Sequence, residues 1–217
     1  MHRKLVSSVF LSLFLVSGSL QAQSTQTTQT TQTTQTTQTE TKEDQTNLET
    51  QLYMVVGTNQ DVADPKLPAV LDPVIKQLRA TLPYKNYRLA AVLVNRVKND
   101  GKLEVGSIGV PIAIIADAPQ AVSRSSYRIR QVKLTIDADG KSVVQLAGFS
   151  FSAQVPVSTS GPVASNNPAP PTFNYEGMNL STDISMREGA PVLVGTLNVG
   201  PAGDALILVV SAKQTPK

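Results

Sequence analysis

Strands are the elements that the pattern of apolar and polar residues predicts most often in this chain. Around residue 151, for example, Phe149, Phe151 and Ala153 share one phase, and the residues between them are polar. This two-residue period is typical of a strand with one face in a core. Periodicity and apolar runs together predict about eight strands, at residues 51–57, 87–97, 103–108, 127–136, 141–155, 173–186, 192–199 and 205–212.

One segment has the three- and four-residue spacing of an amphipathic helix. Leu71, Val74 and Leu78 lie on this spacing, and we expect a helix over residues 67–81. Asp72–Pro73 is typical of an N-cap followed by proline at the first helical position. A helix followed by many strands, without regular alternation of the two, predicts an α+β fold with a mainly antiparallel sheet.

Turn residues and changes of phase predict how some strands are connected. Asp100–Gly101 favours a hairpin, because this dipeptide adopts positive φ at low cost. Asp137–Gly140 predicts a second hairpin for the same reason. The apolar phase changes within residues 127–136, which indicates a β-bulge near Arg130–Gln131. Apolar residues on both phases of 87–97 indicate a central strand that is buried on both faces.

The chain begins with the features of a secretory signal peptide. Residues 1–22 have a basic start, a short apolar run and then small residues, the order found in cleavable signals. Residues 23–47 are dominated by a Thr/Gln repeat that has nothing to bury, so we expect a flexible tether. One β-rich domain is then predicted at 48–214, with a long flexible loop at 156–172. The sequence leaves open whether the tether or the loop has a role.

Composition limits the chemistry that remains after the signal peptide is removed. The sequence has no Cys, and its one His is His2. The mature chain therefore has no disulfide, no Ser-His-Asp triad, no Cys nucleophile and no zinc site built from His and Cys. Removing Arg3 and Lys4 from the 19 basic residues leaves 17 against 16 acidic ones. We therefore expect no nucleic-acid binding, which depends on a concentrated basic surface, and no cofactor or metal.

Four basic residues, Arg124, Arg128, Arg130 and Lys133, lie close together with no acid among them. In a strand, Arg128 and Arg130 would point to the same face. These two arginines either bind an anionic ligand or an acidic partner, or they protect an exposed edge strand against pairing. The carboxylates form no recognisable motif, so we assign no catalytic residue.

The C-terminal part of the chain resembles one protein family. Arg187-Glu188-Gly189 supplies a tight turn, Gly195-Thr196-Leu197 follows within an apolar run, and an aliphatic strand closes the segment at 204–210. This arrangement in residues 180–210 resembles the C-terminal β-module of bacterial secretins, which are pore proteins of the outer membrane. The resemblance implies a secretin-like β-module with Arg187, Glu188, Gly189 and Gly195 at its turn. Residues 48–179 match no family.

These observations favour a non-catalytic exported envelope protein, either periplasmic, outer-membrane-associated or extracellular. It would be a protein-interaction or assembly module on a flexible linker, without a transmembrane helix in the mature chain. Its partner would be another envelope protein or a second copy of itself. One alternative is a module that binds a small anionic ligand or a glycan through Arg128, Arg130 and the 156–172 loop. The other is a carboxylate-dependent enzyme.

Overall fold

The computed structural model describes residues 46–61, 67–112, 121–158, 173–200 and 203–215. The predicted signal peptide lies outside the described residues, and so does nearly all of the predicted tether. The loop predicted at 156–172 also lies mostly outside them, but its first three positions belong to a strand that continues to Ser158.

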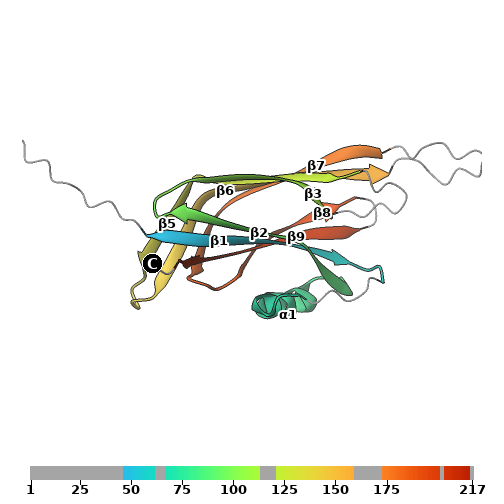
Figure 1. The fold of residues 1–217 in the computed structure, drawn as a ribbon. Helices are drawn as coiled ribbons and strands as arrows, with labels where there is room; N and C mark the ends of the chain where they lie inside the picture. Colours follow the sequence, from blue (N-terminus) through green and yellow to red (C-terminus); the bar gives the residue numbers. More distant parts are fainter. Residues whose placement is uncertain (1–45, 62–66, 113–120, 159–172, 201–202, 216–217) are drawn as a thin grey trace, which may run out of the picture. The chain divides into compact units, whose positions relative to one another are not determined.

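Nine strands form two antiparallel sheets in the described part of the chain (Figure 1). Sheet A has the order β2-β1-β9-β8, and its strands are β1 (Asn47–Thr58), β2 (Asn86–Lys98), β8 (Val192–Val199) and β9 (Asp204–Gln214). Sheet B contains β3 (Leu103–Val110), β4 (Ser123–Ile129), β5 (Gln131–Ile136), β6 (Ser142–Ser158) and β7 (Phe173–Arg187). In sheet B, β6 pairs with β7 along one side and with β4 and β5 along the other, and β3 pairs with β4.

The two sheets pack against each other through their apolar sides. Leu52 and Met54 of β1 belong to the same buried cluster as Phe149 and Phe151 of β6, and all four side chains are fully buried. Burying each such side chain stabilises the fold by about 1.5–3 kcal/mol. The core between the sheets therefore uses the alternation that the sequence shows in residues 149–155.

A short helix covers the opposite face of sheet A (Figure 1). It comprises the 3-10 turn η1 (Ala69–Leu71) and α1 (Asp72–Thr81), which confirms the predicted helix. Val74 and Leu78 pack with Val55 of β1 in a second buried cluster. Asp72 is the first residue of the helix and not its N-cap, because η1 runs directly into α1.

The predicted fold class, α+β with mainly antiparallel strands, is confirmed. There is one more strand than expected because Arg130 divides the predicted strand 127–136 into β4 and β5. β4 also begins earlier, at Ser123. Its first residues are Ser123-Arg124-Ser125-Ser126, which lack the apolar alternation that marks a strand in the sequence.

β2 is an edge strand, so the prediction of a central strand at 87–97 is wrong. In the described residues β2 pairs only with β1. Leu89 and Val92 pack on the helix side of sheet A, whereas Ala91 and Leu93 pack on the side that faces sheet B. Apolar residues on both phases therefore reflect two covered faces and not two neighbouring strands.

The hairpin predicted at Asp100–Gly101 is also wrong, because β2 and β3 belong to different sheets. The turn instead crosses from sheet A to sheet B. Backbone hydrogen bonds attach it to β5: the Asp100 N–H donates to Val132 O at 2.8 Å, and the Val132 N–H donates to Gly101 O at 2.9 Å. The side-chain oxygen of Asn99 accepts from the N–H of Leu134 at 2.8 Å. These hydrogen bonds pair polar groups of the turn with β5, although β2 and β3 do not pair with each other.

The second predicted hairpin and the change of phase near Arg130 are confirmed, but the predicted bulge at Arg130–Gln131 is wrong. Arg128 pairs with Ser150 and Gln131 with Ala147, so neither strand has an extra residue there. β5 and β6 pair on either side of the Asp137–Gly140 turn. At Arg130 the buried positions change from odd numbers, such as Ile129, to even numbers, such as Val132. β6 changes phase at the same level, around Gly148, which has φ +62°. The buried phase therefore changes at the same level in both strands, so their apolar side chains continue to point into the core on either side of Arg130.

Candidate functional site

The outer face of sheet B, which is the face turned away from sheet A, is polar. Along β4, alternate residues such as Ser125 and Tyr127 are buried, whereas Arg124, Ser126 and Arg128 are exposed on the outer face. The helix lies on sheet A, and Figure 1 shows no other described helix or strand over β6 and β7. The side chains on this face are therefore open to a ligand.

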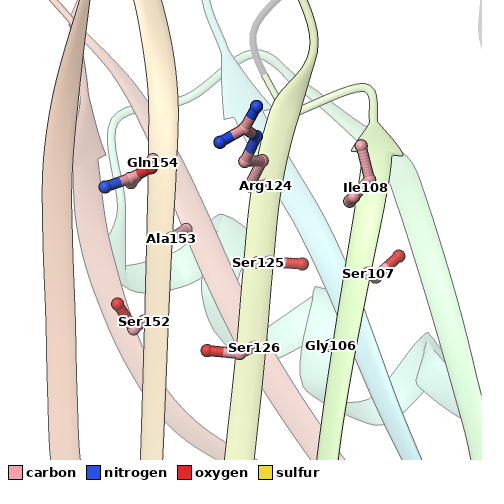
Figure 2. Close-up of a pocket in the computed structure, with 9 residues that line it drawn as sticks. All are labelled: Gly106, Ser107, Ile108, Arg124, Ser125, Ser126, Ser152, Ala153 and Gln154. Atoms are coloured by element: carbon pink, nitrogen blue, oxygen red, sulfur yellow. The ribbon is translucent and has the colours of Figure 1, made fainter.

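A shallow hollow of about 640 Å³ lies on this face over β3, β4 and β6. Figure 2 shows the residues that line it: Gly106, Ser107, Ile108, Arg124, Ser125, Ser126, Ser152, Ala153 and Gln154. The strand register explains its shape. Gly106, Ser126 and Ser152 are neighbours across the three strands. Glycine has no side chain and serine has a short one, so the surface is lowest along this row. Ile108, Arg124 and Gln154 form the next row and have longer side chains.

The hollow contains donors of the kind that bind a polar anion. The guanidinium of Arg124 makes no hydrogen bond or ion pair with another described residue, so its donors are available. Gln154 and the serine hydroxyls add donors and acceptors beside it. No acidic residue or other general base lines the hollow, so nothing there would activate a serine hydroxyl as a nucleophile.

A second hollow, of about 510 Å³, contains both arginines that the sequence singled out. Arg128 and Arg130 line it together with Asp183 and the phase-change residue Gly148. The backbone N–H of Gly148 donates to a carboxylate oxygen of Asp183 at 2.5 Å. A Cβ atom at position 148 would lie 2.0 Å from Nε of Arg130. Glycine at 148 therefore leaves the space that the Arg130 side chain occupies.

The edge-protection interpretation of these arginines is wrong for β4. This strand lies between β3 and β6 and is paired on both sides, so Arg128 protects no open edge. The free side of β5 is already occupied by the 99–101 turn, through the hydrogen bonds to Val132 and Leu134. Ligand or partner binding by Arg128 and Arg130 stays a prediction.

The two edges of sheet A are a different kind of candidate surface. β2 pairs only with β1, and β8 pairs only with β9, in the described residues. Residues 89–94 of β2 and all of β8 contain no charged residue. Val94 is 55% exposed. Long apolar edges of this kind can accept a further strand.

The residues of the secretin-like turn connect the two sheets. Arg187 ends β7 in sheet B, and Glu188 and Gly189 lead into β8 in sheet A. The Gly189 N–H donates to Ala212 O at 2.7 Å, and the Glu188 carboxylate accepts from the Gln214 N–H at 2.8 Å. Gly195 lies within β8, where it packs directly against a leucine of β7. These residues have structural partners, and a binding role for them stays a prediction.

Sequence reasoning missed most of the first hollow because its residues come from three strands. Gly106, Ser152 and Gln154 are separated by up to about fifty positions and form no local motif. A partial signal was present, since Ser152 and Gln154 occupy the polar phase opposite Phe151 and Ala153. This phase marked the outer face, but it did not show which strands would lie beside it.

Other features of the described residues bear on the class of protein. These residues contain no cluster of three or more His, Cys, Asp or Glu side chains that could hold a metal ion. In the same part of the chain, no helix has the length and apolar composition needed to cross a membrane.

Comparisons with known proteins agree with the resemblance to secretins, at a low level. The Salmonella type III secretion injectisome secretin InvG, from its residue 176 to the end and in its open gate state, is 11% identical with a TM-score of 0.37, and the match covers 79% of this chain and 61% of that one. The type II secretin GspD of E. coli K12 is 12% identical with a TM-score of 0.32, covering 79% and 48%. A chain of the Klebsiella pneumoniae type II outer membrane complex, which contains PulD, is 10% identical with a TM-score of 0.31, covering 79% and 39%.

The weak resemblance predicted from residues 180–210 is thus confirmed. The chain spans less than two thirds of the length of these secretin chains. Likenesses at these TM-scores do not establish a shared function. No family model matches the sequence, and no curated protein matches it.

Proposed function

We propose that this chain is a non-catalytic exported envelope protein whose β-domain assembles by adding strands at the open edges of sheet A. Residues 1–22 direct export, and residues 23–47 are the flexible linker that holds the domain at a distance. The observation that carries the proposal is the pair of edge strands in sheet A, one with an uncharged apolar segment at residues 89–94 of β2 and the other, β8, without any charge.

Open edges in monomeric proteins usually carry features that prevent pairing, such as charged residues, proline or a covering segment. Residues 89–94 of β2 read Leu-Ala-Ala-Val-Leu-Val, and β8 reads Val-Leu-Val-Gly-Thr-Leu-Asn-Val. Neither sequence contains a charge or a proline. β5, in contrast, has its free side covered by the 99–101 turn. Sheet A therefore lacks the protection that β5 has.

The direction of the strands favours assembly with further copies of the same chain. The four strands of sheet A alternate in direction, so β2 and β8 run antiparallel to each other. β2 of one copy can then pair with β8 of the next and continue the antiparallel sheet. Such a head-to-tail contact would give a ring or an open chain of copies. A single strand from another envelope protein would cover only one of the two edges.

The non-enzymatic assignment has support from the site itself. The first hollow combines an arginine, hydroxyls and an amide, which is a set for binding and not for general acid–base chemistry. The second hollow includes the carboxylate of Asp183, which accepts a hydrogen bond from the Gly148 N–H. The weak likeness to secretins agrees with an envelope location, but the proposal does not depend on it.

The test is the oligomeric state of the mature chain, measured by sedimentation velocity. Val94→Lys places a charge on the β2 edge at an exposed position, so it should reduce assembly without unfolding the domain. Val70→Lys is the matched control, because Val70 is 41% exposed and belongs to η1, outside both edge strands. The proposal predicts an oligomer for the wild type and Val70→Lys, and a smaller species for Val94→Lys. A monomeric wild type would contradict it.

A further inference from the structure

The outer face of sheet B concentrates positive charge that the chain as a whole lacks. The strand register places four exposed bases on this face, Arg124, Arg128, Lys133 and Arg187, and two exposed acids, Glu104 and Asp183. Arg130, between β4 and β5, is also exposed and lines the second hollow on this face. Beyond the predicted signal peptide, acids and bases are nearly equal in number. The excess of bases on one face is therefore compensated elsewhere, and this face attracts anions while the net charge stays small.

The three arginines follow one line along β4 and its continuation. Arg124 and Arg128 are four residues apart, which corresponds to roughly 13 Å in a strand. Arg124 lines the first hollow, and Arg128 and Arg130 line the second. None of the three guanidinium groups makes an ion pair or a hydrogen bond with another described residue. A ligand that meets all three must be extended and must carry more than one negative group.

The side chains between the arginines are hydroxyls and amides. Ser126 and Ser152 are paired across β4 and β6, and Asn179 of β7 is the next neighbour in the same row. Gln154 adds an amide beside Arg124. Hydroxyls and amides both donate and accept hydrogen bonds, so this row matches a ligand that is itself rich in hydroxyl groups.

In the part of the chain that the structure describes, the well-exposed large apolar side chains of this face lie at its margin. Ile108 is 73% exposed on the edge strand β3, and Tyr175 is 44% exposed near the start of β7. A folded protein partner would need apolar or aromatic anchors at the centre of the contact. A lipid bilayer would need apolar side chains to insert. The centre of the face, between Arg124 and Arg128, offers neither.

We propose that the outer face of sheet B binds an acidic polysaccharide, an extended chain of hydroxyl-bearing sugars that carries carboxylate or sulfate groups. Arg124, Arg128 and Arg130 pair with the acidic groups, since a guanidinium fork matches these anions. Ser126, Ser152 and Gln154 contact the sugar hydroxyls. The site goes beyond assembly at sheet A, because β4 is an inner strand of the other sheet.

The test measures binding of the mature chain to oligogalacturonate, which carries carboxylates, and to heparin oligosaccharides, which carry sulfates. Neutral dextran of similar length is the negative probe, and phosphatidylglycerol vesicles test for a membrane surface instead. The double variant Arg124→Gln/Arg128→Gln should weaken binding by at least about tenfold, as expected when charge-assisted contacts are lost. Added salt should weaken wild-type binding as well.

Two further variants distinguish a built site from general charge attraction. Lys76→Gln/Arg79→Gln removes the same charge from exposed positions on α1, and it should leave the affinity within about twofold of the wild type if position matters more than net charge. Ser126→Leu keeps every charge but fills the floor of the first hollow, and it should weaken binding. Thermal melts establish that each variant is folded.

The proposal is overturned if neither acidic oligosaccharide binds, if dextran binds equally well, or if only the vesicles bind. It is also overturned if the arginine and helix double variants lose affinity to the same extent, or if Ser126→Leu binds like the wild type. None of these substitutions lies on β2 or β8. Loss of polysaccharide binding with unchanged sedimentation would therefore leave the assembly proposal standing, and the reverse holds as well.

Discussion

Replacing Gly195 by alanine should destabilise the domain through one contact between the two sheets. Gly195 lies in β8 of sheet A, and a Cβ atom there would be 2.4 Å from Cδ1 of Leu180 in β7 of sheet B. Ordinary contacts between carbon atoms are about 3.5–4.0 Å, so Leu180 or one of the strands must move by roughly 1 Å. Glycine at this position therefore lets the two sheets approach closely.

The expected cost follows from this overlap. Overpacking a core contact costs about 1–3 kcal/mol, and the reduced freedom of the unfolded chain returns about 0.4–1 kcal/mol for glycine to alanine. The atom that must yield is the end of a flexible side chain, which favours the lower part of the range. We expect Gly195→Ala to lower the free energy of unfolding by about 1–2 kcal/mol, and the melting temperature by roughly 2–4 °C per kcal/mol.

Urea unfolding of the mature chain measures this loss, and a second substitution tests its cause. In Leu180→Ala the opposing side chain is gone, so adding Gly195→Ala should cost little, and the two changes should be non-additive by at least about 0.5 kcal/mol. Gly177→Ala is the matched control, because a Cβ at Gly177 in β7 meets nothing within 4 Å. Overlap with Leu180 is not the cause if Gly195→Ala is as stable as Gly177→Ala, or if the double variant shows simple addition.

Two further outcomes follow from buried polar groups. Arg88 is buried, and its guanidinium donates to Pro111 O at 2.6 Å and to Ile112 O at 2.7 Å. Arg88→Met should lower the free energy of unfolding by about 2–4 kcal/mol, because it leaves two carbonyls unsatisfied. A loss below about 1 kcal/mol in urea unfolding would contradict this. Burial raises the pKa of Tyr127 and of Tyr87 above the usual value of 10.0, so the unfolded chain loses these protons first. The contribution of the two neutral phenols to the free energy of unfolding should be fully present below pH 10 and should be lost as the pH rises above it. Denaturant midpoints that stay constant into that range would show that the phenols are not buried.

Local periodicity was enough to predict most of the elements and the fold class. The alternation around Phe151 and the spacing of Val74 and Leu78 arise from the faces that these elements bury. The phase change at Arg130 was visible for the same reason, because a kinked strand must turn its apolar residues over to keep them in the core. Information of this kind is contained in a few consecutive residues.

Pairing between strands was harder to predict because it depends on distant residues. Asp100–Gly101 has the sequence of a hairpin turn, yet its backbone bonds to Val132 of another strand. β2 has apolar residues on both phases because both of its faces are covered, and a central strand has the same sequence pattern. The first hollow needs Gly106, Ser126 and Ser152 to become neighbours, and only the three-stranded register brings them together.

The most direct test of assembly through β2 and β8 mixes two variants that are each blocked at one edge. Val94→Lys blocks β2 and leaves β8 open, whereas Thr196→Lys, at an exposed position of β8, leaves β2 open. Each variant alone should sediment as a monomer, and an equimolar mixture should form a defined heterodimer through the two remaining edges. A mixture that stays monomeric, or an oligomer formed by either variant alone, would contradict the head-to-tail pairing of β2 with β8.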